Sequence, residues 1–582
     1  MKRLMLAATM AAGLAYAAAA DDDPALPALT VDNSASTTMA AWMAANGVTD
    51  LSGYGEVIYA GTAEITNTTE LSGWGGTVRI RRGAVLVAAH SDALGTAAGP
   101  THVEDGGTLE IWGAATGATR LPNEAVTCAG QGVALPDGSY RGALYNSYAV
   151  RNESGNVPWP HNITFLGDTY IRVKNNVLQD FATGSTWNMN GHDVTFRSGF
   201  TYNRMGNLTL TNPGNVTITG KGANFSGTLN GDATHTLTIN DSDACIWLPN
   251  VSSNKTGVKT GWTLAMKSGT YFSVGLTNPN AYSYWLGPVQ LNDMHRLWMQ
   301  DAPRFCGLAL CGPVSGEQGG FRSHTSGWKG FMLMLMNPGN TFKRGVSMRD
   351  GCFTATANGA LPADGGALVM TNGTITLYGG IDYALPDCVL SATGKVTTAS
   401  ATGAWKKLSK TGVGEWIYDS RVGADILDLA KGDLLLTGEG VTAPLPVFTN
   451  VTVATGACLR FDDGFDGVWD VPCLGASGVL SNGNVRVTEK LKVDPAVILS
   501  GGRLEVKEGA LSFAEGATFD FAEGSSLAAL DKTAVYTVAT ASGGVSGRLS
   551  ASGAAGENHW SLSVQDGAAC LFYASGMTLI IR

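Results

Sequence analysis

The sequence is short of charge. Only 15% of its 582 residues are Asp, Glu, Lys or Arg, whereas about 25% is usual in soluble domains. Basic residues are the scarcer kind, with 38 Lys and Arg against 48 Asp and Glu and a net charge of −10. Because nucleic acids are bound largely through phosphate contacts from Lys and Arg, this balance argues against a nucleic-acid partner.

Long hydrophobic runs are missing beyond the N-terminus. Residues 1–20 read as a secretory signal peptide, with Lys2 and Arg3 before a short apolar stretch and small residues before Asp21. No later run reaches the roughly 18 apolar residues that suggest a membrane-spanning helix, so we expect no transmembrane segment after signal removal. The expected location is the cell surface or the extracellular medium, with the periplasm as the alternative.

Catalytic and cofactor motifs are also lacking. The sequence has no hydrolase nucleophile elbow, phosphate loop or dinucleotide fingerprint, and we expect no cofactor apart from the calcium considered below. Its nine cysteines are mostly isolated, and an odd number cannot pair fully within one chain. We interpret most of them as small buried residues, and the pairs to test for disulfides are Cys306–Cys311 and Cys458–Cys473.

Glycine, in contrast, is abundant, with 77 residues, about twice the usual share. It recurs at the start of short segments such as 75–80, 106–111, 365–370 and 501–506, in which alternating or β-branched apolar residues follow. Glycine permits a tight bend, and alternation is typical of a strand with one buried face. Helix patterns are nearly absent after the signal, apart from residues 36–45.

Short strands with corner glycines, repeated along the chain, predict a solenoid in which each coil buries its apolar face against the next. The predicted fold class is all-β: a right-handed, single-stranded parallel β-helix with a small C-terminal β cap. The expected divisions are a signal peptide (1–20), an N-terminal cap (21–50), a β-helix (51–400), continuing solenoid repeats (401–529) and the C-terminal cap (530–582).

Five segments carry a resemblance to a known family. Residues 142–147 read GALYNS, 162–169 NITFLGDT, 187–195 WNMNGHDVT, 340–347 NTFKRGVS and 408–416 LSKTGVGEW. In residue pattern and in their order along the chain they resemble the autotransporter-associated β-strand repeat of exported bacterial proteins. The resemblance implies a passenger-like right-handed β-helix, of the pectin lyase-like kind, at the outer-membrane surface of a bacterium. We expect it to lack the C-terminal autotransporter barrel, because the end of the chain is rich in Gly and Ala.

An acidic cluster is the first candidate site. Asp462, Asp463, Asp466 and Asp470 lie within a short Gly-containing segment, and carboxylates at such spacing are suitable ligands for Ca²⁺. The alternative is that these residues form Asp-Gly turns at a corner of the solenoid.

Tryptophans form the second candidate site. They concentrate in residues 245–330, and Trp262, Trp285, Trp298 and Trp328 are the candidates for stacking on sugar rings. The alternative is that these large rings fill the interior of wide coils.

The expected function is that of a non-catalytic surface or secreted protein, structural or adhesive, with polysaccharide or cell-surface glycans as partners. The alternative is a polysaccharide lyase or glycoside hydrolase on the same scaffold. Such an enzyme needs carboxylates and basic groups that converge from successive coils. Basic runs occur at 79–82 and 343–349, but the sequence shows no obvious carboxylate set at coil spacing from either.

Overall fold

The structure is a computed structural model. It describes residues 26–90, 92–112, 125–147, 160, 162–174, 186–198, 209–220, 222–224, 232–241, 245–248, 261–274, 282–299, 306–323, 331–398, 400–438, 445–475 and 477–574. The signal peptide predicted at 1–20 lies outside these residues.

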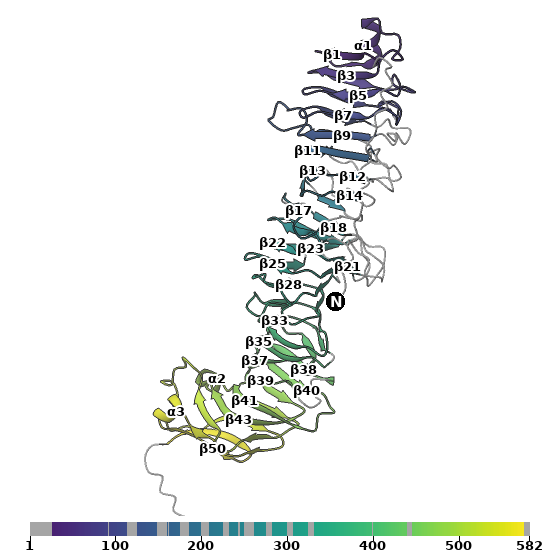
Figure 1. The fold of residues 1–582 in the computed structure, drawn as a ribbon. Helices are drawn as coiled ribbons and strands as arrows, with labels where there is room; N and C mark the ends of the chain where they lie inside the picture. The colour runs from purple at the N-terminus through teal and green to yellow at the C-terminus, as the bar shows by residue number, and fades with distance from the viewer. Residues whose placement is uncertain are drawn as a thin grey trace, which may run out of the picture.

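The described chain winds into an elongated β-solenoid of about 16 turns (Figure 1). Strands hold 52% of the described residues and helices 4%. Along the solenoid, strands pair in parallel with strands one coil earlier and later; Val57, for example, lies opposite Leu29 on one side and Val78 on the other. The all-β parallel β-helix predicted from the sequence is therefore confirmed.

Sheet 1 has 19 strands and covers the N-terminal half of the rod. Its strands are β1 (Ala28–Asn33), β2 (Thr37–Thr38), β3 (Glu56–Gly61), β4 (Glu64–Asn67), β5 (Thr77–Ile80), β6 (Val85–Ala88), β7 (Thr101–Val103), β8 (Thr108–Ile111), β9 (Ala125–Gly130), β10 (Leu144–Asn146), β11 (Asn162–Val173), β12 (Thr186–Asn188), β13 (Val194–Ser198), β14 (Thr209–Thr211), β15 (Val216–Gly220), β17 (Thr236–Ile239), β19 (Thr263–Met266), β22 (Val289–Leu291) and β25 (Val314–Ser315).

Sheet 2 has 18 strands and begins near the middle of the chain. Its strands are β16 (Gly222–Asn224), β18 (Cys245–Leu248), β20 (Tyr271–Val274), β23 (Met294–Met299), β26 (Gly320–Ser323), β28 (Val346–Met348), β30 (Leu368–Met370), β32 (Asp382–Leu385), β33 (Cys388–Leu390), β35 (Thr402–Lys410), β37 (Gly423–Leu429), β39 (Phe448–Val453), β41 (Val468–Gly475), β43 (Asn484–Val493), β45 (Leu511–Phe513), β46 (Thr518–Phe521), β48 (Val545–Ser546) and β49 (Ser550–Ala551).

Sheet 3 has 14 strands and accompanies sheet 2 to the C-terminal end. Its strands are β21 (Tyr282–Trp285), β24 (Cys306–Leu310), β27 (Phe331–Leu335), β29 (Gly351–Ala355), β31 (Gly373–Leu377), β34 (Gly394–Thr398), β36 (Glu415–Asp419), β38 (Gly432–Leu436), β40 (Ala457–Phe461), β42 (Val479–Ser481), β44 (Leu504–Lys507), β47 (Tyr536–Ala541), β50 (Trp560–Gln565) and β51 (Ala568–Tyr573). Three helices complete the described elements: α1 (Met39–Asn46), α2 (Pro495–Leu499) and α3 (Gly553–Glu557).

The core consists of stacked columns of apolar side chains. Phe353, Ile375, Val396 and Tyr418 follow one another in register on β29, β31, β34 and β36, and all four are fully buried. Burial alternates along β31 and β34, as one inward and one outward face require. Because a shift of one residue would turn the apolar set outward, each column fixes the register of its strands.

Stacked glycines mark the beginning of three strands in sheet 3. Gly351, Gly373 and Gly394 open β29, β31 and β34. A Cβ atom on Gly373 would lie 1.9 Å from the Gly351 carbonyl oxygen, and one on Gly394 would lie 2.1 Å from that of Gly373. Gly373 also has a φ of +123°, where other residues are strained. Close approach of the coils therefore demands glycine at this corner.

Helix α1 lies at the N-terminal end of the rod (Figure 1). It begins after Thr38, whose hydroxyl accepts the Ala41 N–H at 3.1 Å. The side chain of Met39 is buried, and the Trp42 indole N–H donates to the Asp32 carbonyl at 3.3 Å. The helix is thus attached to the coil formed by β1.

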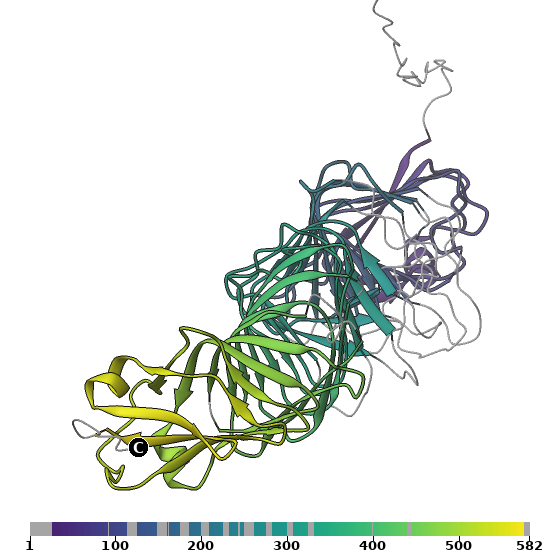
Figure 2. The ribbon, with the colours of Figure 1, turned by 90° about the horizontal axis from the view of Figure 1, so that it is seen from below.

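At the other end the parallel pattern changes. Strand β47 pairs in parallel with β44, but β51 runs antiparallel to both β47 and β50. Figure 2 shows these strands gathered at the C-terminal end. Antiparallel strands placed over the last parallel coil occupy an edge that would otherwise be open to pairing with other chains. The predicted C-terminal β cap is confirmed.

Candidate functional site

A β-hairpin interrupts the regular coils between β9 and β10. Within residues 131–142, the Arg141 N–H donates to the Val133 carbonyl at 2.8 Å. At its tip Asp137 accepts the Ser139 N–H at 2.9 Å and the Ser139 hydroxyl at 2.6 Å. We call this segment the 131–142 hairpin. Such side-chain hydrogen bonds to the backbone two residues on stabilise a tight turn locally.

Arg141 anchors the 131–142 hairpin to the coils. Its guanidinium is 2.5 Å from Glu64 and also pairs with Glu110, and the side chains of Arg141 and Glu110 are only 15% and 9% exposed. The guanidinium carbon also lies 5.7 Å from the ring centre of Tyr145. Buried charges are costly to leave unpaired, so this arrangement resists displacement of the hairpin.

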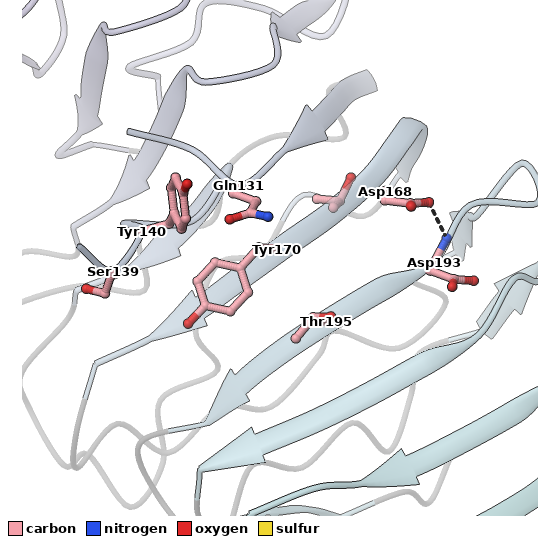
Figure 3. Close-up of a pocket in the computed structure, with 8 residues that line it drawn as sticks. Gln131, Ser139, Tyr140, Asp168, Tyr170, Asp193 and Thr195 are labelled. Atoms are coloured by element: carbon pink, nitrogen blue, oxygen red, sulfur yellow. Dashed lines mark hydrogen bonds between the residues drawn. The ribbon is translucent and has the colours of Figure 1, made fainter. Parts of the chain in front are cut away.

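A cleft of about 490 Å³ lies between the hairpin and the outer face of sheet 1. Figure 3 shows Tyr140 and Gln131 near Tyr170, with Asp168 and Asp193 toward the other end. The residues that line it are Gln131, Ser139 and Tyr140 from the hairpin and Asp168, Thr169, Tyr170, Asp193 and Thr195 from β11, β13 and the turns beside them.

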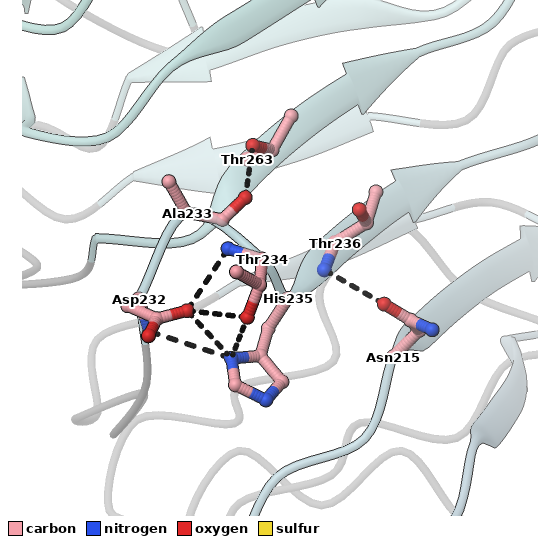
Figure 4. Close-up of polar contacts among 7 residues, drawn as sticks. All are labelled: Asn215, Asp232, Ala233, Thr234, His235, Thr236 and Thr263. Carbon is pink, nitrogen blue, oxygen red and sulfur yellow. Dashed lines mark hydrogen bonds and ion pairs between the residues drawn. The ribbon is translucent and has the colours of Figure 1, made fainter.

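The two carboxylates of the cleft belong to a ladder that joins successive coils. Asp168 accepts the Asp193 N–H at 3.0 Å, and Asp193 accepts the Asn215 N–H at 2.7 Å. Asn215 in turn accepts the Thr236 N–H at 2.9 Å (Figure 4). We call these four residues the turn ladder. It fixes both carboxylates at the surface, where the Asp168 side chain is 79% exposed.

A second polar group follows at the turn before β17. Asp232 accepts the Thr234 N–H at 2.9 Å and hydroxyl at 2.5 Å, and the same oxygen is 3.2 Å from Nδ1 of His235 (Figure 4). These hydrogen bonds from Thr234 lower the pKa of Asp232. In a catalytic triad, acid and nucleophile meet opposite nitrogens of the histidine. Here the Thr234 hydroxyl also faces Nδ1, at 3.4 Å, so the cluster is a capped turn.

Charged residues from successive coils also meet on sheet 1. Arg79 lies 2.7 Å from Glu56 and 3.6 Å from Glu104. His102 is its neighbour in register, and burial, followed by the charge of Arg79, lowers the pKa of His102. The interpretation that no carboxylates lie one coil away from the basic run at 79–82 was therefore wrong. The sequence held this signal, because Glu56 and Glu104 stand about one coil before and after Arg79.

The second basic run is paired in the same way. Lys343 is 2.6 Å from Asp364, and Arg344 is 3.6 Å from Asp293. Hydrogen bonding to Lys343 lowers the pKa of Asp364. Both basic runs therefore form ion pairs between coils at the surface, of the kind that contributes little stability individually.

The predicted calcium site does not assemble. Asp470 forms two hydrogen bonds with Arg486, at 2.7 and 2.6 Å, and Asp463 accepts the Asn482 amide at 2.9 Å. Asp462 accepts the backbone N–H of Asp463. Asp466 lies in the same turn, and within the described ranges no three His, Cys, Asp or Glu side chains are grouped to hold a metal ion. Asp462 accepts a hydrogen bond within its own turn, and Asp463 and Asp470 pair with residues of the following coil.

The predicted glycan-stacking tryptophans lie mainly inside. Trp262 and Trp285 have no exposed surface, so their rings cannot stack on a sugar and the prediction fails for both. Trp298 is half-buried and stands edge-on to Tyr271, with ring centres 5.7 Å apart. Trp328 lies outside the described residues. Trp262 and Trp285 instead fill the interior of the coils. This is the alternative that the sequence had left open.

Neither of the two candidate cysteine pairs forms a disulfide. Cys458 and Cys473 are free thiols on different sheets, in β40 and β41. The Cys311 thiol lies 3.5 Å from the sulfur of Met336 and is in no disulfide. Burial raises the pKa of the Cys458 thiol to about 11, which keeps it protonated and unreactive near neutral pH.

No helix in the described part of the chain is long and apolar enough to cross a membrane. Comparison with protein-family models, with curated proteins and with solved structures finds no match for this chain. The assignment of this chain as a β-helix repeat protein therefore rests on its own geometry.

Proposed function

We propose that the chain is a non-catalytic, exported structural or adhesive protein that contacts glycans through its repeated outer face. The observation that carries the proposal is a set of uncharged polar columns on sheet 1, in register from coil to coil. Repetition of one weak contact along a rigid rod gives strong binding overall. The columns are Asn162–Thr186–Thr209, Thr164–Asn188–Thr211 and Thr195–Thr217–Thr238.

The ionisation of the carboxylates favours this reading over an enzyme. In the described part of the chain, each aspartate with a clearly shifted pKa has it lowered, chiefly by hydrogen bonds from neighbouring Ser, Thr or Lys residues. A glycosidase needs a general acid whose pKa is raised, so that it holds a proton to donate. The six aspartates are Asp50, Asp137, Asp232, Asp293, Asp364 and Asp531.

Two sequence features support export. The signal-peptide pattern of residues 1–20 and the resemblance to the autotransporter-associated repeat both favour a location at the bacterial surface or in the medium. A rod of stacked coils is suited to hold a binding face away from its point of attachment.

One observation favours the alternative, a polysaccharide lyase or hydrolase. Arg79, Glu56, Glu104 and His102 bring acid and base groups together from neighbouring coils. Arg79 is ion-paired with both glutamates, however, and none of the four residues lines the cleft beside the 131–142 hairpin.

The test is to incubate the mature chain with neutral and uronate polysaccharides and to measure new reducing ends and unsaturated uronates. In parallel, chain displayed on beads is tested for adhesion to the same immobilised polysaccharides. We expect adhesion without product. Product above the buffer blank that disappears in Glu104→Gln or Arg79→Ala would replace the proposal with the enzymatic alternative, and absence of adhesion to every surface would overturn the adhesive role.

A further inference from the structure

We propose that the cleft beside the 131–142 hairpin binds a neutral hexose unit of a glycan chain. This inference deepens the proposed function and rests on it, because it names the place and the class of sugar. A volume of about 490 Å³ falls in the range of small-molecule sites, roughly 300–1,000 Å³. The cleft is open to the surface, as binding within a longer chain requires.

Two aromatic rings give the cleft its apolar surface. Tyr140 comes from the hairpin and is 41% exposed, and Tyr170 stands half-buried on β11. The Arg172 guanidinium donates to the Tyr140 carbonyl at 3.2 Å and so ties that residue to the sheet. The C–H faces of a hexose pack on aromatic rings, while a phenol hydroxyl remains available for a hydrogen bond.

The polar groups of the cleft match the hydroxyls of a neutral sugar. Gln131 offers both an amide donor and an acceptor, Thr195 and Ser139 offer hydroxyls, and Asp168 and Asp193 offer carboxylate oxygens. Among the described residues, the lining contains two carboxylates and no Lys or Arg side chain. A uronate would therefore meet like charge, whereas a neutral hexose can donate its hydroxyl protons to the carboxylates.

The site is held in place before any ligand arrives. Arg141 fixes the hairpin through Glu64 and Glu110, and the turn ladder fixes Asp168 and Asp193. Groups that are already ordered lose little further conformational freedom on binding. Weak single-site affinity, strengthened by display of many chains, is what an adhesive rod needs.

The experiment measures binding of neutral gluco-, galacto- and manno-configured oligosaccharides and of oligogalacturonate to the intact mature chain by calorimetry. We expect at least one neutral oligosaccharide to bind, and oligogalacturonate not to bind. Tyr140→Ala and Tyr170→Ala should each weaken binding by about tenfold or more. The matched control is Tyr378→Ala, because Tyr378 is a 52% exposed tyrosine far along the chain beside sheet 3; it should bind as the parent does.

A second pair of variants separates binding from folding. Asn215 occupies the same place in the turn ladder as Asp193 and accepts the next N–H with an amide oxygen. Asp168→Asn and Asp193→Asn should therefore leave thermal unfolding unchanged while altering affinity for the neutral sugar. Equal binding of oligogalacturonate, no binding of any neutral oligosaccharide, or binding that survives Tyr140→Ala and Tyr170→Ala would overturn the inference. If beads carrying these variants still adhere, the cleft is not the glycan-binding site, whereas the proposed adhesive function is retained.

Discussion

At the scale of single residues, Lys410 shows what a buried charge does in this fold. Its side chain is fully buried, and its ammonium group donates to the carbonyl oxygens of Gly412 and, at 3.4 Å, Ser391. Desolvation lowers the pKa of Lys410. The lysine stabilises the turn after β35 by joining it to the preceding coil.

His295 is a second buried titratable residue, and it makes stability depend on pH. Its side chain has no exposed surface, and Nδ1 lies 3.1 Å from both the hydroxyl and the carbonyl oxygen of Thr270. Burial lowers the pKa of His295, while the hydrogen bond with the Thr270 carbonyl and the charge of Asp293 oppose this shift and Arg322 adds to it. The folded chain therefore favours the neutral imidazole.

The direction of the effect follows from this shift. An unfolded histidine has a pKa of about 6.5, so the stabilisation is present above that pH and is lost as the pH falls toward the lower folded value. We expect the urea midpoint to fall between about pH 7.5 and about pH 5.5, and His295→Gln to reduce that fall. His559→Asn changes an exposed histidine at a positive φ and should leave the fall unchanged. An identical fall in His295→Gln and the parent would contradict the assignment.

The candidate-site residues were hard to predict because their roles depend on neighbours far along the chain. The sequence pointed to Trp262 and Trp285 as surface rings, yet both lie inside. It gave no sign of the cleft, because Gln131, Tyr170 and Thr195 come together only when consecutive coils stack. The Asp137-Gly138 pair was the available turn signal for the hairpin.

At the scale of elements, the strands that follow glycine pairs were predicted well. Residues 77–80, 108–111, 368–370 and 504–507 are strands in the structure, because corner glycine followed by alternating apolar residues has few other stable arrangements. The 131–142 hairpin was not predicted, since it is an insertion within one coil. In that coil many more residues separate Val126 from its partner Ile163 than separate Val57 from its partner Val78 in a regular coil.

The glycine stack of β29, β31 and β34 allows a direct test of corner packing. Gly373→Ala would place a methyl group 1.9 Å from the Gly351 carbonyl at a φ of +123°. We expect a loss of about 1–3 kcal/mol in the free energy of unfolding from backbone strain alone, measured by urea titration with circular dichroism. The control is Gly464→Ala, where a methyl group meets no heavy atom within 4 Å and a change within about 0.5 kcal/mol is expected. Equal stability of the two variants would show that the coils can separate at this corner at no cost.

At the scale of the whole molecule, stacking creates an edge at each end of the rod. The C-terminal edge of sheet 3 is occupied by β47, which lies between β44 and β51. An open strand edge is a template for pairing with another chain. The C-terminal antiparallel strands therefore serve solubility as well as stability.

A truncation after Val535 tests this role, because it removes β47, β48 and β49 and so exposes the edges of β44, β45 and β46. We expect the shortened chain to self-associate in a concentration-dependent manner, measured by light scattering after size exclusion. Truncation after Ala574 keeps β47, β50 and β51 and should match the intact mature chain. A monomeric Val535 truncation at the same concentrations would mean that these edges are harmless.

The direction of the hydrogen bonds has a mechanical consequence. Those between neighbouring strands run along the rod, from coil to coil. Pulling on the two ends would load the bonds between successive coils in series, so we expect the rod to yield one coil at a time. Each event, such as release of the segment from Ile375 to Val396, frees roughly 70 Å of chain. We expect a rod built in this way to dissipate a sudden load through many small ruptures and to keep its remaining coils intact.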